Sequence, residues 1–175
     1  FTYLAVILSF SSYAANLDVG QGRKFSRIEE ANDAAKDGDT ILVHSLPGNA
    51  AYEKTAVFVI RRNLTFKAVP ADKSKLVPLS GKGFDYSGEG RIPRAIFQFN
   101  KDADNCLLEG FELFDAHNNS FNGAGVRINQ ANDVTVRNCN IHGNDMGIMS
   151  NGDGTQDTAR NQLFENCIIH DNGTE

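Results

Sequence analysis

The sequence predicts an all-β solenoid, in which short parallel strands stack coil on coil. Three observations lead to this prediction: one helical segment is followed only by β-like runs, similar segments recur at intervals along the chain, and asparagine is concentrated in the second half. The 18 asparagines include 14 from Asn100 onward. With 175 residues, of which 41% are hydrophobic, the chain can bury a core of ordinary size.

A single helix is expected near the N-terminus. In the segment IEEANDAA, Ile28, Ala31 and Ala35 share one helical face, and Ser26 is the expected N-cap. Gly38 suits the end of such a helix. We expect this helix to cap the first coil, whose open end would otherwise expose unpaired strand edges.

The other elements are expected to be strands, because turn residues separate the β-like runs and no second helical stretch follows. The predicted strands cover residues 40–43, 56–60, 63–69, 76–79, 95–99, 106–113, 125–129, 134–141, 147–150 and 163–169. Taken alone, this pattern is typical of either a β-sandwich or a solenoid.

Internal repeats decide between these two architectures. Three similar segments start at positions 105, 133 and 161 and are therefore evenly spaced. The same spacing pairs Asn138 with Asn166 and His142 with His170. A second set, FQFN, VRIN and IMSN, lies between these segments, with connecting turns of variable length. The repeats predict coils whose apolar positions stack on those of the next coil.

The asparagines are interpreted as turn ladders. Asparagine tolerates left-handed backbone geometry at a sharp bend, and its amide can hydrogen-bond the asparagine of the next coil. Two ladders are predicted, one of Asn100, Asn129 and Asn151 and one of Asn138 and Asn166.

The two ends of the chain carry further expectations. Residues 1–14 contain an apolar stretch followed by small residues, which is typical of the end of a secretory signal peptide, although a first β-strand is the alternative. We therefore expect a secreted, periplasmic or extracellular protein with a cap over residues 15–44 and coils over residues 45–175. Because a solenoid needs a cap on its last coil, the sequence is expected to be part of a longer protein.

Charge, hydropathy and cysteine content exclude several classes. Seventeen basic and 22 acidic residues give a net charge of −5, which argues against nucleic-acid binding. No apolar run approaches the roughly 18 residues needed to span a membrane, and we expect a monomer. Three cysteines cannot form a complete internal disulfide framework. Cys139 and Cys167 are expected to be buried thiols, and Cys106 to be unpaired.

Two parts of the sequence resemble a known family. The run VGQGRKFSRIEEANDAAKDGDTILV, followed by NLTFKAV, is similar to the capping start of right-handed parallel β-helix proteins of the pectate-lyase-like superfamily. The run GAGVRINQANDVTVRNCNIHGNDMGIMSNG, followed by NQLFENCIIHDNG, resembles the repeats of secreted members. The resemblance covers roughly Asp18 to Glu175. It implies a right-handed parallel β-helix with one N-terminal capping helix, incomplete at its C-terminal end.

The resemblance also implies a function on polysaccharides. In such folds, sugar polymers lie along an outward strand face; lyases use a lysine or arginine base, often with Ca²⁺, and hydrolases use paired aspartates. The expected activity is lyase-like β-elimination on an acidic polysaccharide, and the alternative is a non-catalytic glycan-binding or adhesive scaffold. A hydrolase or an epimerase is less favoured, because the paired aspartates are not seen.

Arg127 is the first candidate site residue. Strand alternation places Val126 and Ile128 inside, and Arg127 and Asn129 outward or at the bend. Arg127 is predicted to act as a base or to bind a uronate carboxylate through two contacts. Gln98, its neighbour in register, and Asn129 are predicted to bind substrate, and a solvated surface charge is the alternative.

His142 and His170 form the second candidate group. Each follows an inward isoleucine, so both should project outward on successive coils, close enough to act on one substrate or to share a metal. They are predicted to be catalytic, with Asp115, His117 and Asp145 as nearby substrate-binding residues. The alternative is a ladder of surface residues.

The loop SNGDGTQDTARN, over residues 150–161, is the candidate calcium site. It carries Asp153 and Asp157 among glycine and asparagine but lacks the spacing of an EF-hand. These two aspartates are the predicted ligands of Ca²⁺, and an ordinary polar loop is the alternative.

Overall fold

The computed structural model describes residues 14–173, so nearly all of the predicted signal segment lies outside the described residues. In this part of the chain there is one α-helix, α1 (Ile28–Ala34), one 3₁₀ turn (Pro47–Asn49) and strands in three sheets. Sheet A contains, in spatial order, β1 (Asn16–Val19), β2 (Thr40–His44), β4 (Thr65–Val69), β7 (Leu107–Glu109), β10 (Thr135–Arg137) and β13 (Leu163–Glu165). Sheet B contains β5 (Val77–Ser80), β8 (Phe111–Phe114), β11 (Asn140–His142) and β14 (Ile168–His170). Sheet C contains β3 (Val57–Val59), β6 (Ala95–Phe99), β9 (Ala124–Asn129) and β12 (Met146–Asn151).

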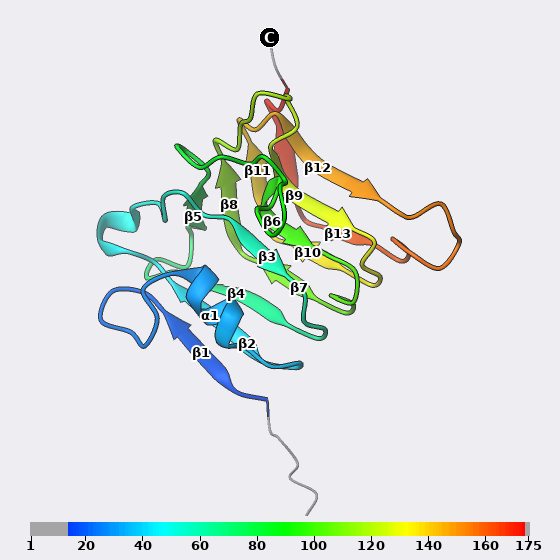
Figure 1. Cartoon of the computed structure of the whole chain (residues 1–175). Coiled ribbons are helices and arrows are strands. Elements are labelled where there is room, and N and C mark those ends of the chain that lie inside the picture. The colour runs from blue at the N-terminus through cyan, green and yellow to red at the C-terminus, as the bar shows by residue number, and fades with distance from the viewer. Residues whose placement is uncertain (1–13, 174–175) are drawn as a thin grey trace, which may run out of the picture.

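The strands are arranged in a rotation through the three sheets. From β4 onward the chain passes from sheet A to sheet B to sheet C and then back to sheet A, and it repeats this order up to β14. All of the strand pairs are parallel. Figure 1 shows the result, a stack that begins at β1 and α1 and ends at β12 and β13. The predicted all-β architecture of parallel strands is thus confirmed.

The predicted repeat spacing is confirmed by the strand register. Val136 pairs with Leu108 on one side and with Phe164 on the other. In sheet B, Ile141 lies between Leu113 and Ile169 in the same way. One repeat of the sequence therefore corresponds to one step from a strand to its neighbour in the same sheet.

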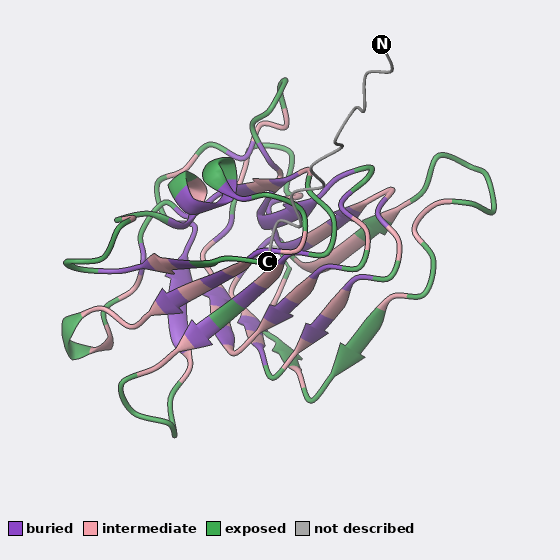
Figure 2. Ribbon diagram, turned by 90° about the horizontal axis from the view of Figure 1, so that it is seen from below, coloured by how far each residue is buried: buried purple, intermediate pink, exposed green. Residues whose placement is uncertain are grey.

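The three sheets face one shared hydrophobic core. Phe66 of sheet A contacts Phe97 of sheet C, with ring centroids 5.0 Å apart, and Phe97 lies 6.0 Å from Phe111 of sheet B. All three rings are fully buried. Figure 2 shows the buried positions concentrated on the central strands, and exposed positions on the loops and on one outer strand. Burial of large apolar side chains on every coil is the main stabilising contribution of this arrangement.

Three of the predicted strands are each two strands in different sheets, so these boundaries were wrong. The predicted strand 106–113 is broken at Gly110, 134–141 at Asn138 and 163–169 at Asn166. These residues have φ angles of 89°, 53° and 51°. One residue in the left-handed region turns the chain from sheet A to sheet B, and only glycine and asparagine adopt that region at low cost. The turn is too short to interrupt the apolar pattern, which explains the error.

Two details at the N-terminal end also differ from expectation. Strand β1 was not predicted, because its four residues form a strand by pairing with β2 rather than by their own pattern. The helix N-cap is Arg27, not Ser26. Glu30 accepts hydrogen bonds from the backbone N–H groups of Ser26 and Arg27, and this reverse contact places Ser26 one residue before the cap. Helix α1 packs on β1, β2 and β3.

The first predicted asparagine ladder is confirmed. The amide of Asn151 donates to Asn129 at 2.7 Å, and that of Asn129 donates to Asn100 at 3.3 Å. Asn138 and Asn166 both occupy bends, as predicted, but Asn138 donates to Glu109 instead of joining a ladder. The ladder at the end of sheet C therefore holds three successive coils together.

The three cysteines are free thiols, as expected. Cys139 is buried as predicted, whereas Cys167 is only partly buried, because it lies between β13 and β14, which are edge strands of sheets A and B. Burial raises the pKa of Cys106 to about 12, so this thiol is not reactive at neutral pH. A hydrogen bond with Cys167 and burial both raise the pKa of Cys139. Among residues 14–173, none of the helices has the length and apolar character needed to cross a membrane.

Candidate functional site

A polar cleft lies on the outward face of sheet C. It has a volume of about 400 Å³ and is lined by strand residues and by the loop between β5 and β6. The lining residues are Phe58, Gly88, Gly90, Ile92, Arg94, Gln98, Asn100, Arg127 and Asn129. The structure thus brings together three residues that were predicted to form one site: Arg127, Gln98 and Asn129.

Arg127 projects outward because it alternates with buried neighbours along β9. Val126 and Ile128 are fully buried, whereas Arg127 is half-buried. Its guanidinium donates to the sulfur of Met149 at 2.9 Å and to the amide oxygen of Asn151 at 3.0 Å. Both acceptors are neutral and belong to β12, the next strand of sheet C. These two contacts therefore hold the guanidinium in place but do not neutralise its positive charge.

The floor of the cleft is a hydrogen-bonded amide network. Gln98, directly in register with Arg127, donates to Asn100 at 2.7 Å. Asn100 is tied to the backbone of Val59, and Asn129 donates to it from the next coil. Buried amides that bond one another are rigid. They present a fixed set of donors and acceptors beside the arginine.

Arg94 supplies a second cation from the loop wall. Its backbone N–H donates to Gln98 at 2.9 Å, and its carbonyl accepts from Ala124 at the start of β9. Gly88 packs directly against the Arg94 side chain, where any Cβ would collide with the guanidinium nitrogen. The glycine lets this loop lie close to the cleft, with a φ of 75°. The sequence analysis missed Arg94, because it lies before the β6 alternation begins.

The positive charge in the cleft is not compensated. Within residues 14–173, no carboxylate lies within 4.0 Å of a guanidinium nitrogen of Arg94 or Arg127. The described residues that line the cleft include no aspartate or glutamate. Burial and the like charge of Arg94 lower the pKa of Arg127, which is the direction expected for two cations that share a site. An anion in this cleft would relieve the repulsion.

The second predicted group lies elsewhere, on the outward face of sheet B. The structure stacks Phe114, His142 and His170, with ring centroids 5.5 and 5.1 Å apart. His142 lies 3.1 Å from a carboxylate oxygen of Glu112, a residue that the sequence analysis did not single out. The predicted proximity of the two histidines is confirmed. His142 is covered on both ring faces and its side chain is 27% exposed, whereas His170, at the end of the stack, is 43% exposed. The catalytic role of the two histidines stays a prediction.

Asp145 does not join the sheet B histidines. It lies 2.7 Å from His117 instead, and its carboxylate is buried. Asp115 and His117 line a cavity of about 250 Å³ together with the loop that follows β5. The residues of this trio are therefore neighbours of one another, at the turn from sheet B to sheet C. His117 and Asp145 are one full coil apart in the sequence, so the repeat spacing could have revealed the pair.

The loop with Asp153 and Asp157 does not assemble a ligand set. The Asp153 carboxylate accepts hydrogen bonds from Thr155 and Thr158, and these lower its pKa to about 2. Asp157 is 88% exposed. Over the described residues 14–173, no group of three or more histidine, cysteine, aspartate or glutamate residues could hold a metal ion. The role of Ca²⁺ stays a prediction from the sequence.

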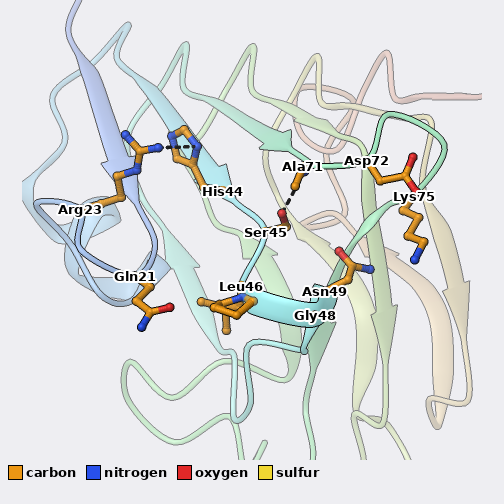
Figure 3. Close-up of a pocket in the computed structure, with 11 residues that line it drawn as sticks. Gln21, Arg23, His44, Ser45, Leu46, Gly48, Asn49, Ala71, Asp72 and Lys75 are labelled. Atoms are coloured by element: carbon orange, nitrogen blue, oxygen red, sulfur yellow. Dashed lines mark hydrogen bonds between the residues drawn. The ribbon is translucent and has the colours of Figure 1, made fainter.

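A further cavity lies where β1, β2 and β4 end, with a volume of about 470 Å³ (Figure 3). His44 in its wall lies 2.6 Å from Asp18 and 3.5 Å from Arg23. Asp72 and Lys75 lie beside each other on the opposite side. The lining of this cavity includes both cations and a carboxylate, Asp72, in contrast to the cleft on sheet C, whose described lining residues include no carboxylate.

Comparison with known proteins does not place the chain in a family. No family model, no curated protein and no solved structure matches it. The cleft with Arg94 and Arg127, the sheet B stack and the His117–Asp145 pair are therefore interpreted from their own geometry and chemistry.

Proposed function

We propose that the chain forms a right-handed parallel β-helix, works outside the cytoplasm and binds an acidic polysaccharide in the cleft on sheet C. The fold proposal is supported by the rotation of strands through three parallel sheets around one phenylalanine core. The proposed location depends on the signal-like residues 1–14. Hereafter the cleft lined by Arg94, Gln98, Asn100, Arg127 and Asn129 is called the arginine cleft.

The observation that carries the proposed ligand is the pair of uncompensated arginines. A guanidinium presents parallel N–H donors that match a carboxylate, and such charge-assisted hydrogen bonds are about twice as strong as neutral ones. The amides of Gln98 and Asn129 add donors and acceptors for hydroxyl groups. Carboxylates and hydroxyls side by side are the chemistry of a uronate sugar.

The shape of the cleft favours a polymer over a small anion. Gln98, Arg127 and Met149 occupy one register position on β6, β9 and β12, so the outward face that carries Arg127 continues across three strands of sheet C. A ligand that follows this direction contacts a new strand about every 4.8 Å. Successive sugar units can therefore engage successive coils of the same face.

Binding to polyuronates tests the proposal. We expect the full chain to bind polygalacturonate or alginate, measured by calorimetry or affinity electrophoresis, and to bind neutral dextran much more weakly. Affinity should fall as salt is added, because exposed charge pairs are screened. The double variant Arg94→Gln/Arg127→Gln should lose affinity by about 100-fold, from about 1.4 kcal/mol for each arginine.

A matched control removes the same charge elsewhere. Arg62 and Arg160 are half-exposed and lie 4.0 and 3.9 Å from carboxylates outside the cleft. Arg62→Gln/Arg160→Gln should retain most of the affinity. Equal losses in the two double variants would show that net charge, not the cleft, attracts the polymer, and the proposal would be abandoned.

Lyase-like β-elimination is the second candidate function. The observation that favours it is that Arg127 lines the cleft beside a second cation, Arg94, and that burial and this like charge lower its pKa, which is the direction an arginine base needs. Elimination from a uronate polymer creates an unsaturated product that absorbs in the ultraviolet. Appearance of this absorbance, and its loss in Arg127→Gln, would support catalysis; binding without absorbance, with or without added Ca²⁺, would leave a glycan-binding scaffold.

A further inference from the structure

All four histidines lie close to a carboxylate, but only one of these carboxylates is buried. Asp18 beside His44, Glu112 beside His142 and Asp171 beside His170 have side chains that are 40%, 34% and 87% exposed. Asp145 beside His117 is 2% exposed. An exposed carboxylate can turn away and is screened by water, whereas a buried one stays in place. His117 is therefore the histidine with a fixed partner.

Three hydrogen-bond partners surround the Asp145 carboxylate. Its first oxygen lies 2.7 Å from Nδ1 of His117, and its second accepts from the backbone N–H groups of Asn118 and Gly123 at 2.8 and 3.0 Å. An ionised carboxylate only accepts hydrogen bonds, so Nδ1 of His117 carries the hydrogen. The lone pair of the neutral ring is then on Nε2. The His117 side chain is 56% exposed and lines a cavity.

The loop that carries His117 is built to hold this geometry. The Asn118 side chain accepts from the backbone N–H groups of Ser120 and Asn122 and donates to the carbonyl of Tyr86. Phe121, at the tip, has a φ of 54° and is 63% exposed. A bulky residue in the left-handed region is strained, and such strain persists only where the surroundings enforce it. The hydrogen bonds of Asn118 and Asp145 provide that enforcement.

The cavity in front of His117 contains one cation and one anion. Its lining is Gly81, Lys82, Gly83, Phe84, Asp115 and His117, and its volume is about 250 Å³. Among residues 14–173, no carboxylate lies within 4.0 Å of the Lys82 ammonium. With a neutral His117, the charges of Lys82 and Asp115 cancel. Unlike the arginine cleft, this cavity suits a small, uncharged group.

We propose that His117 is a general base that activates water for the hydrolysis of small, uncharged esters in this cavity, with Asp145 as its positioning residue. Nε2 takes a proton from water, and the water oxygen bonds to the ester carbonyl carbon. The carbonyl electrons move to oxygen, where the Lys82 ammonium stabilises the charge. The C=O bond then re-forms, the C–O bond to the alcohol breaks, and the alcohol oxygen takes the proton from Nε2. The products are a carboxylic acid and an alcohol.

Hydrolysis of 4-nitrophenyl acetate by the full chain tests this inference. We expect turnover above the buffer rate, and a fall in kcat/KM of about 100-fold in His117→Gln, which is the usual contribution of a general base. Lys82→Gln should lower kcat more than it changes KM. The control is His44→Gln, which also removes a histidine that lies beside a carboxylate and lines a cavity; its rate should match that of the unaltered chain.

Asp145→Asn separates positioning from simple loss of structure. If the variant folds, as judged by its circular dichroism, kcat should fall while KM changes little, because the ring is no longer held in its reactive orientation. A folded variant with an unchanged kcat would contradict the role of Asp145. Equal rates in His117→Gln and His44→Gln, or no turnover above buffer by the unaltered chain, would overturn the proposal. The inference does not rest on polysaccharide binding, which is measured separately.

Discussion

The outward faces of sheets A and C each present a column of residues in register, but within residues 14–173 only the column on sheet C has a cation without a carboxylate partner. The column on sheet A alternates in charge through Lys67, Glu109, Arg137 and Glu165. The corresponding column on sheet C contains a single charged residue, in the order Phe58, Gln98, Arg127 and Met149.

The difference lies in one position. Glu109 on sheet A is 3.2 Å from Arg137 and 3.8 Å from Lys67, so both cations are compensated. Its counterpart on sheet C is Gln98, in register with Arg127, and it carries no charge. The same scaffold therefore presents an arginine outward in both sheets. The residue one coil earlier decides whether that arginine is available to a ligand.

Gln98→Glu should convert the sheet C column into the sheet A arrangement, and of the variants that compare the two columns it should have the largest effect. The new carboxylate would compensate Arg127 and repel a polyuronate, because like charges brought together at an interface cost several kcal/mol. A cost of about 2 kcal/mol corresponds to roughly 30-fold weaker binding. The affinity for polygalacturonate, measured by calorimetry, checks this expectation.

Gln156→Glu is the control for this change, because Gln156 is exposed on the loop after β12 and gains the same charge. It should leave the affinity within about twofold of the unaltered chain, as expected of a distant, screened charge. If both variants bind as well as the unaltered chain, the cleft is not the binding site.

The reverse change, Glu109→Gln, should destabilise the fold by about 1 kcal/mol at neutral pH. The loss of stability should be small because the side chains of Arg137 and Lys67 are 39% and 52% exposed, so water screens both ion pairs. Burial acts to raise the pKa of Glu109, but the hydrogen bond from Arg137 and the two positive charges outweigh it, and the net pKa lies below the ordinary value of 4.5. The stabilisation is therefore fully present above that ordinary value and is lost as the pH falls through the lowered pKa of the folded chain.

Urea unfolding at neutral pH and at about pH 3 measures this difference. The gap between Glu109→Gln and the unaltered chain should shrink in acid, since protonated glutamate and glutamine are both neutral. A gap that is constant with pH would mean that shape, not charge, makes Glu109 stabilising.

The arginine that this variant frees on sheet A should bind polyuronate more weakly than the arginine cleft does, because Arg94 and its loop are specific to sheet C.

Asn129→Ala should also lower stability by only about 1 kcal/mol, with binding weakened only a few-fold. It removes the ladder contacts to Asn100 and Asn151 but leaves both arginines in place. Thermal unfolding with Asn119→Ala as control checks it, because the exposed Asn119 belongs to no ladder. Equal melting temperatures for the two variants would show that the ladder adds nothing to stability.

Much of the fold was accessible from the sequence. The regular spacing of the repeats predicted the register of sheets A and B, and alternation along VRIN predicted the outward direction of Arg127. Both predictions work because stacked strands repeat the same environment on every coil. Strand ends were less accessible: Gly110, Asn138 and Asn166 each turn the chain within one residue, and the apolar pattern continues through the bend.

The candidate sites were only partly accessible, for a related reason. Alternation fixes the direction of a side chain inside a strand but not in a turn, where single backbone dihedral angles decide. Asp145 was therefore expected beside His142, whereas it turns toward His117. Arg94 was missed because its place beside the cleft depends on Gly88 and on the path of the loop between β5 and β6.

Periodicity alone predicted the stack of parallel strands, one asparagine ladder and the outward position of Arg127. These properties repeat along the chain, so a local pattern is enough to specify them. The three-dimensional contacts were needed to show that Arg94 lies beside Arg127 without a carboxylate partner and that the buried Asp145 contacts His117. Charge compensation and burial depend on which side chains are in contact across strands and loops, and the sequence repeat does not specify those contacts.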